Sequence, residues 1–471
     1  MKHLFVYTFL WIGMASFAND LTISRPILYQ ENGTSYTVLQ ISWDNAWHNK
    51  TNHDAVWVFF KLLNNNWNTR HVKVLPSGHE VVSTSNDKDL IRFEVPSDSV
   101  GLFLKPGKPF RGKIQATLKI MLDQKSFENA DTYNGNFSAY GIEMVHIPKG
   151  GFILGEADTS KMDQGTLYRS NASGEFKGLF PVTAENQVIE IGPGENKLYY
   201  QAPEAYRGDQ AGTIPAAFPK GVNPFYIMKY EPTQGQYARF LNALSPDQSQ
   251  HRANFGGKDY YANRGSIVME HGVYTARVPD ALCNYISWDD AMAYADWAGL
   301  RPLTEFEFTK AARGTGKPGK NEFPWGTSSK SNIQRSVTDD GVLVMAQGLT
   351  ESQLSDENKE WFAASFYWVM DLSGGLWERV ISIGHPKGRA YLGTHGDGVL
   401  TNYGFATNED WPKGVQETGG FGFRGGGFYG YGRAYHDFNP YSPVGYRPFG
   451  GWSGGNRAKA YGGRFGRTVN E

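Results

Sequence analysis

The stretch Met370–Val380, MDLSGGLWERV, constrains the fold more than any other part of this sequence. Its adjacent glycines, Gly374 and Gly375, permit positive φ angles without a Cβ clash, which predicts a tight turn. Leu376 and Trp377 place apolar mass directly after the bend. A turn so rich in glycine and aromatic residues is typical of a buried structural element rather than a surface loop.

The polar residues of this stretch suggest how the turn is held. Asp371 and Ser373 are residue types that hydrogen-bond their own backbone in turns, and we expect them to close this one. Glu378 follows the apolar pair and could offer oxygen atoms to a metal ion.

Composition limits the class of partner. The 471 residues include 46 basic and 47 acidic side chains, for a net charge of −1, so no bulk field would attract nucleic acid or an anionic membrane. Aromatic residues make up 14% of the chain and glycine contributes 56 residues, which favours many turns fixed by large side chains over long helices.

The N-terminus resembles a secretory signal. An apolar run covers Leu4–Phe17, and the small residues Ser16 and Ala18 stand at the −3 and −1 positions of a cut before Asn19. Residues 1–18 are therefore predicted to be removed on export. No later stretch is long and apolar enough to span a bilayer, so we expect a secreted protein of the periplasm or cell surface.

Cys283 is the only cysteine, so no intrachain disulfide can form. Its apolar neighbour Leu282 favours a buried, unreactive side chain over a nucleophile.

Residues 19–140 are predicted to form a β-sandwich. In the run Thr34–Trp43, apolar Leu39 and Ile41 alternate with polar residues, which is typical of a half-buried strand. Further strand-like runs follow at sandwich-like spacing: His53–Leu63, His71–Leu75, Leu90–Val95, Gly101–Leu104 and Lys113–Leu122. The histidines of this region show no metal-ligand spacing, and the polar stretch Gln124–Asn136 is expected to be a linker.

The remainder, 141–471, is predicted to be an α+β domain. A strand, a Pro/Gly turn and a second strand are expected over Met144–Gly155, followed by an insertion at about 156–222 without helical periodicity. Capping boxes that begin at Thr233, Ser287 and Thr304 predict three helices. From Gly419 to Gly466, glycines alternate with aromatic residues, which favours short strands and loops over disorder.

Nine motifs in series resemble the sulfatase-modifying-factor family, whose formylglycine-generating-enzyme-like domain has a C-type-lectin-like fold. They are Ile147–Phe152, Pro224–Ile227 with Glu231–Thr233, Ile286–Ala291, Leu300–Glu307, Ala311–Gly314, Phe323–Gly326, Met370–Val380, Phe423–Phe428 and Gly463–Arg467. The resemblance covers about residue 143 to the C-terminus and leaves the β-rich region outside it.

The resemblance implies the family's fold, but a shared fold does not by itself imply the family's chemistry. Sulfatase-activating members use two cysteines in the C-terminal segment to bind copper, and here Arg433–Arg467 contains none. The HxxxHxE iron motif of the sulfoxide-forming branch is also absent. No catalytic residue is therefore assigned.

The resemblance also implies one structural calcium ion. The family usually has Asn where Gly375 stands, and that Asn helps Glu378 to hold the ion, so Glu378 remains a candidate calcium ligand with one partner missing. A second oxygen-bearing turn contains His395 and Asp397, for which a solvated glycine-rich turn is the simpler interpretation.

The late region forms the ligand-facing surface in C-type-lectin-like folds, and its Tyr, Trp, Arg and Asn residues suit contact surfaces. The candidate ligand-binding residues are Arg433, His436, Tyr441, Arg447, Trp452, Asn456 and Arg457. Many of the aromatic residues could equally be internal. Adjacent His436 and Asp437 seldom point the same way, which argues against a catalytic pair.

Three functions remain open. The leading hypothesis is an exported, non-catalytic binding or assembly module, with the β-sandwich as adaptor and a protein or glycan partner in the cell envelope. The rival is a metal-dependent oxidoreductase with ligands such as His395, Asp397 and His436. The third is a carbohydrate- or ligand-binding surface protein that uses the aromatic tail.

Overall fold

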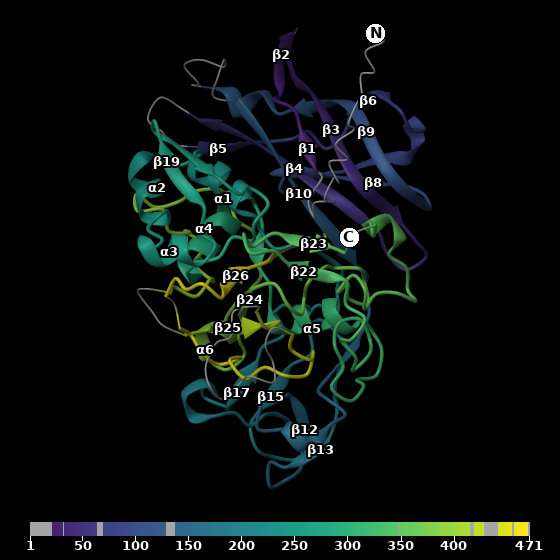
Figure 1. Ribbon diagram of the computed structural model, residues 1–471, viewed down its shortest axis with the longest axis vertical. Coiled ribbons are helices and arrows are strands. Elements are labelled where there is room, and N and C mark those ends of the chain that lie inside the picture. The colour runs from purple at the N-terminus through teal and green to yellow at the C-terminus, as the bar shows by residue number, and fades with distance from the viewer. Residues whose placement is uncertain are drawn as a thin grey trace, which may run out of the picture.

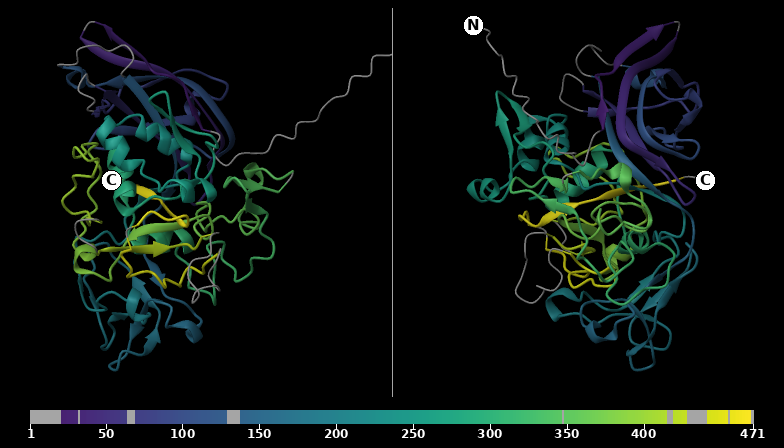
Figure 2. Two further views of the ribbon diagram at one scale, coloured as in Figure 1. Left: turned by 60° about the vertical axis from the view of Figure 1, so that its left-hand side comes forward. Right: turned by 45° about the vertical axis from the view of Figure 1, so that its right-hand side comes forward.

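A computed structural model describes residues 21–31, 33–63, 69–128, 137–346, 348–414, 419–427, 441–454 and 456–469. These residues form a mixed α+β fold made mostly of strands, with few and short helices. Figure 1 shows the N-terminal strands at one end of the molecule and several helices at one side below them. A small sheet, which includes β12, β13, β15 and β17, lies at the opposite end in every view (Figure 2).

Two sheets contain the N-terminal strands. One has the order β1–β3–β9–β6 with β2 also paired to β3, and the other has the order β21–β27–β18–β10–β4–β8–β7 with β5 paired to β4. The strands of this region are β1 Thr22–Ile23, β2 Ile27–Glu31, β3 Thr34–His48, β4 Asp54–Leu63, β5 Thr69–Val72, β6 Glu80–Thr84, β7 Ile91–Glu94, β8 Gly101–Pro106, β9 Phe110–Leu122 and β10 Phe137–Ile147.

Alternation along β3 builds the core between these sheets. Leu39 and Ile41 are buried, whereas Gln40 between them is exposed, as the sequence predicts. They belong to one apolar cluster with Val58 of β4 and Leu102 of β8, both fully buried. Strands are present at the expected runs, although β5 covers Thr69–Val72 rather than His71–Leu75, and their apolar faces meet.

A separate N-terminal β-sandwich is not confirmed, because the second sheet continues into the rest of the chain. β10 pairs with β4 along its first part and with β18 (Phe225–Met228) along its last four residues. β18 in turn pairs with β27 (Phe465–Thr468), near the C-terminus. The predicted division after residue 140 falls inside β10.

Three helices begin at the predicted caps. The side chains of Thr233, Ser287 and Thr304 accept from the third backbone amide of α1 (Gln234–Leu241), α4 (Trp288–Trp297) and α5 (Glu305–Arg313), and each box is reciprocal. The short helices α2 (Pro246–Arg252), α3 (Lys258–Ala262) and α6 (Pro386–Arg389) were not expected. None of these three is long enough to show an apolar face of helical period.

The insertion near residues 156–222 contains strands and no α-helix. Five of its strands form one small sheet in the order β13–β12–β16–β15–β17. The strands from here to the C-terminal region are β11 Phe152–Leu154, β12 Tyr168–Ser170, β13 Phe176–Gly178, β14 Phe180–Val182, β15 Ile189–Ile191, β16 Leu198–Tyr199, β17 Gly212–Ile214, β19 Ile267–Glu270, β20 Val273–Ala276, β21 Arg301–Pro302, β22 Arg335–Val337 and β23 Leu343–Met345.

The tail forms short strands packed by aromatic side chains, as expected for the described part. β24 (Trp377–Ile381) is the middle strand of a sheet with β25 (Phe421–Arg424) and β26 (Tyr461–Gly463). Buried aromatic residues of one cluster pack beside this sheet, namely Trp377, Phe423, Tyr446, Phe449 and Tyr461. Among the described residues, no helix has the length and apolarity needed to traverse a lipid bilayer.

Stacked histidines lie on the second sheet, where β4 meets β10. The rings of His53 and His146 are parallel, with centroids 4.7 Å apart, and the His53 Nε2 lies 3.1 Å from the Tyr226 hydroxyl. Burial lowers the pKa of His53 to about 2 and that of His146 to about 4. The folded state therefore resists protonation of both rings.

His146→Phe should reduce the sensitivity of the fold to acid. The folded pKa of His146 lies below the ordinary value of 6.5, so the unfolded chain binds a proton more readily and stability is lost as the pH falls below 6.5 toward 4. Phenylalanine keeps the ring but binds no proton. Urea unfolding at a series of pH values should show that the variant loses on the order of 2 kcal/mol less than the wild type between neutral pH and acid. His271→Phe, at an exposed turn, is the control, and equal acid losses in both variants would contradict this account.

Candidate functional site

The glycine turn, residues 370–376, is fully buried and leads into β24. Asp371, Gly374 and Gly375 have φ angles of 59°, 109° and 62°. The polar residues do not bond their own backbone as expected. Both carboxylate oxygens of Asp371 accept from Arg335 Nε at 2.7 and 2.8 Å, and Ser373 exchanges two hydrogen bonds of 2.9 Å with the backbone of Ser442. Segments distant in sequence therefore hold the turn.

Gly375 makes room for a buried carboxyl group. Glu231, 1% exposed, accepts a hydrogen bond from the Leu376 amide at 3.1 Å. A Cβ at position 375 would lie 2.1 Å from Glu231 Oε2, and one at Gly462 would lie 3.0 Å from Oε1. Position 375 therefore requires glycine for two reasons, its backbone conformation and this close approach.

Arg464 neutralises Glu378 beside that carboxyl group. Its Nε and Nη2 donate to the two oxygens of Glu378 at 2.8–3.0 Å. Its remaining N–H groups reach the carbonyls of Met228, Lys229 and Met370, each at 2.9 Å. One fully buried guanidinium thus joins β24, β18 and the glycine turn.

Glu231 and Glu378 compete for one cation. Burial raises the pKa of Glu231 well above its ordinary range, and the neighbouring Glu378 raises it further. Burial also raises the pKa of Glu378, but the Arg464 guanidinium acts in the opposite direction. Because Arg464 gives its bonds to Glu378, we assign the proton to Glu231 and the negative charge to Glu378.

These residues do not fit the calcium ion that the family resemblance implies. Calcium requires six to eight oxygen ligands. Both Glu378 oxygens already accept from a guanidinium, and Gly375 contributes no side chain. No group of three or more His, Cys, Asp or Glu side chains among the described residues is arranged to hold a metal ion.

A second buried ionic group connects the N-terminal strands to this turn. Lys229 Nζ lies 3.7–3.8 Å from carboxylates of Asp54, Glu143 and Glu351, on three separate segments. Arg335 lies 3.6 Å from Glu351 and also binds Asp371 of the glycine turn. Burial raises the pKa of Asp54 to about 6, against the effect of Lys229. The N-terminal sheets are thus joined electrostatically to the turn.

Two of the three arginines predicted to bind a ligand, Arg447 and Arg457, form ion pairs within the protein. Arg447, 1% exposed, donates from Nε and Nη2 to Glu305 at 2.5 and 3.1 Å. Arg457 donates from Nε and Nη2 to Asp290 at 2.6 and 2.7 Å, and Arg252 lies 3.0 Å from the same carboxylate. These contacts tie the tail to α5 and α4.

The other predicted tail residues are dispersed. Half-buried Tyr441 meets the ring of Trp325 edge-on at 5.9 Å, and half-buried Trp452 packs at 5.6 Å from Phe423. Asn456 is exposed, and its carbonyl accepts from Arg379. The remaining candidates, Arg433 and His436, together with Asp437, lie outside the described residues.

The turn at His395 and Asp397 is not a shared oxygen cluster in this structure. His395 Nε2 accepts from the Thr468 amide at 3.0 Å, whereas Asp397 caps the Val399 amide at 2.8 Å. Burial lowers the pKa of His395 well below its ordinary value. The imidazole is therefore neutral and bonds the end of β27.

The main residues that sequence reasoning missed are Glu231, Arg464 and Lys229. Lys229 and Glu231 follow the apolar run of β18 directly, and a charge so placed is buried only if it is paired. Their position directly after β18 could therefore have predicted buried, paired charges. The identity of each partner was not readable, since Arg464 and Glu378 are 86 residues apart.

The structure defines an irregular α+β domain. It has short strands, capped helices and a buried glycine-rich turn around paired charges. Ionic contacts hold it together as well as its apolar core. The model of the sulfatase-modifying factor enzyme 1-like domain matches residues 174–440. The chain belongs to this family.

Two known proteins show weaker similarity to this chain. A formylglycine-generating enzyme of Thermomonospora curvata is 25% identical over 216 residues, which cover 41% of this chain and 69% of that protein. The solved structure of domains D2 and D3 of the major pilin SpaD from Corynebacterium diphtheriae covers 41% of this chain and 88% of its own, at 12% identity. Its TM-score of 0.15 carries no argument.

Arg464→Met should destabilise the protein by about 3–5 kcal/mol, because it leaves the Glu378 charge buried without a partner. Arg277→Met is the matched control, since the Arg277–Glu270 pair is exposed and should cost less than about 1 kcal/mol. Chemical unfolding of both variants measures the difference. Equal costs would show that the Glu378 pair does not organise the turn.

Gly375→Ala should cost more than Gly272→Ala. Both glycines have positive φ, but a Cβ at Gly272 would meet nothing within 4 Å. Replacing Glu231 by Ala should remove most of the extra cost at position 375, which a double-mutant cycle of unfolding free energies detects. Additive costs would contradict the close approach.

Proposed function

We propose that this protein is an exported, non-catalytic binding or assembly module of the cell envelope. The observation that carries the proposal is the state of Cys283, the only thiol in the sequence. A copper site of the sulfatase-activating kind needs two thiolates. The apolar N-terminal run supports export.

The environment of Cys283 disfavours the thiolate. Its side chain is 1% exposed, and its amide donates to the Pro232 carbonyl at 2.9 Å. Burial raises the pKa of the thiol well above its ordinary value, and the nearby Asp290 carboxylate adds to this. A reactive cysteine needs the opposite surroundings, partly exposed and electropositive.

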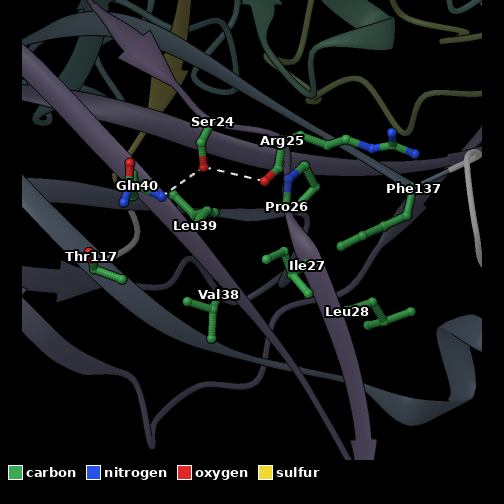
Figure 3. Close-up of a pocket in the computed structure, with 10 residues that line it drawn as sticks. All are labelled: Ser24, Arg25, Pro26, Ile27, Leu28, Val38, Leu39, Gln40, Thr117 and Phe137. Carbon is green, nitrogen blue, oxygen red and sulfur yellow. Dashed lines mark hydrogen bonds between the residues drawn. The ribbon is translucent and has the colours of Figure 1, made fainter.

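The N-terminal sheets offer a surface for the adaptor role. β2 pairs only with β3 among the described strands, so its other edge presents unpaired backbone groups. A cavity of about 590 Å³ lies beside the break between β1 and β2 (Figure 3). Ile27 on its wall is 57% exposed, and Leu39 and Phe137 contribute buried apolar surface. An extended segment of a protein partner could add to this edge.

An oxidation assay tests the absence of family catalysis. A cysteine-containing sulfatase peptide, incubated with the protein, copper and oxygen, should show no formylglycine by mass spectrometry. The Thermomonospora enzyme serves as the positive control. Turnover that is lost in Cys283→Ser would overturn the proposal.

Capture of envelope proteins tests the binding role. Ile27→Lys should weaken retention of the specific partner at least tenfold without lowering thermal stability, because the side chain is already exposed. Val188→Lys changes a comparably exposed aliphatic side chain, 59% exposed, on the far end of the molecule and should bind normally. Equal retention by both variants would exclude the β2 edge.

A further inference from the structure

A second cavity lies away from the glycine turn, among α2, α3 and the β19–β20 hairpin. These elements stand together at one side of the molecule (Figure 1). The cavity encloses about 660 Å³, within the range of small-molecule sites. Both helices and the hairpin contribute lining residues.

Aromatic rings form one wall of this cavity. Phe255 and Tyr260 stack with centroids 4.5 Å apart, and Tyr261 meets Tyr260 edge-on at 5.2 Å. Phe255 and Tyr260 are buried, which fixes the wall, whereas Tyr261 is 52% exposed. Exposed Met269, at 57%, extends the apolar surface on β19. A rigid wall thus carries one ring that is open to a ligand.

Polar groups make up another part of the lining. The side chains of Gln250, His251 and Asn254 are exposed and line the cavity. Next to them, Gly256 and Gly257 have φ angles of 89° and 65°, and a Cβ on either would meet nothing within 4 Å. The glycines leave open space and an accessible backbone beside the two amides.

The lining carries no Asp, Glu, Lys or Arg among its described residues. A charged ligand would lose hydration there without gaining an ionic partner, which is unfavourable. A purely apolar ligand would leave the amides and the imidazole unused. The combination of ring faces with amide and imidazole groups selects an uncharged ligand that has both C–H and hydroxyl surfaces.

We propose that this cleft binds a neutral carbohydrate of one or two sugar units. One C–H face of the sugar packs on the Tyr261 ring, and its hydroxyl groups bond the amides of Gln250 and Asn254. The proposal goes beyond the assembly role, because it uses neither the β2 edge nor the state of Cys283.

The test is binding of the full chain to an array of neutral, acidic and basic glycans, followed by calorimetry with the strongest neutral sugar. Tyr261→Ala should lower affinity at least tenfold, and Tyr261→Phe should restore it, because phenylalanine keeps the ring face. Asn254→Ala should also weaken binding. Trp361→Ala removes an aromatic side chain that is 43% exposed elsewhere and should bind like the wild type.

Several outcomes would overturn the proposal. These are no binding to any neutral glycan, binding confined to charged glycans, or equal affinity of Tyr261→Ala and the wild type. Thermal unfolding of each variant shows whether the fold is kept, and Tyr261→Phe separates loss of the ring from loss of structure. Partner capture through β2 can fail or succeed without changing any of these results.

Discussion

Burial of the Arg464 guanidinium is the constraint on which the centre of the molecule depends. A fully buried cation must have its charge balanced and its donors satisfied, since water cannot do either. Glu378 supplies the charge, and carbonyls of β18 and of the glycine turn supply the other acceptors. The fixed directions of the guanidinium donors restrict how these segments can be arranged around it. The turn reaches this arrangement with positive φ angles at Asp371, Gly374 and Gly375.

The second ionic group extends the same principle across the N-terminal strands. Lys229 directly follows β18, and its carboxylate partners come from β4, β10 and the segment at Glu351. A buried ion pair is weak support for net stability, because desolvation offsets much of the attraction. A misplaced strand would leave one of these charges buried without a partner, which is strongly unfavourable. The apolar clusters bury most of the side-chain surface, and the buried charges disfavour other registers of the strands.

Sequence reasoning succeeded where the determining contacts are local. The boxes at Thr233, Ser287 and Thr304 set helix starts through atoms three residues away, so the starts were readable. Asp371 shows the limit of local reasoning. It was expected to bond its own turn, but Arg335, 36 residues away, takes both of its oxygens. The continuity of the second sheet through β10 was missed for the same reason, because a strand's pattern shows its buried faces and not its neighbours. The tail residues predicted from residue type to bind a ligand include Arg447 and Arg457. Their guanidinium groups pair instead with Glu305 and Asp290.

The position of β27 has a consequence for the order of events during synthesis. This strand, Phe465–Thr468, lies between β18 and β21 inside the sheet that also holds the N-terminal strands β4, β7 and β8. The sheet therefore cannot be completed until residue 468 has left the ribosome, although its first strands emerge some four hundred residues earlier. Arg464, which bonds the Met370 carbonyl of the glycine turn, is synthesised equally late. A nascent chain of this kind keeps the sheet incomplete until β27 has been made, so the pairing of β18 and β21 with β27 is a late step in folding.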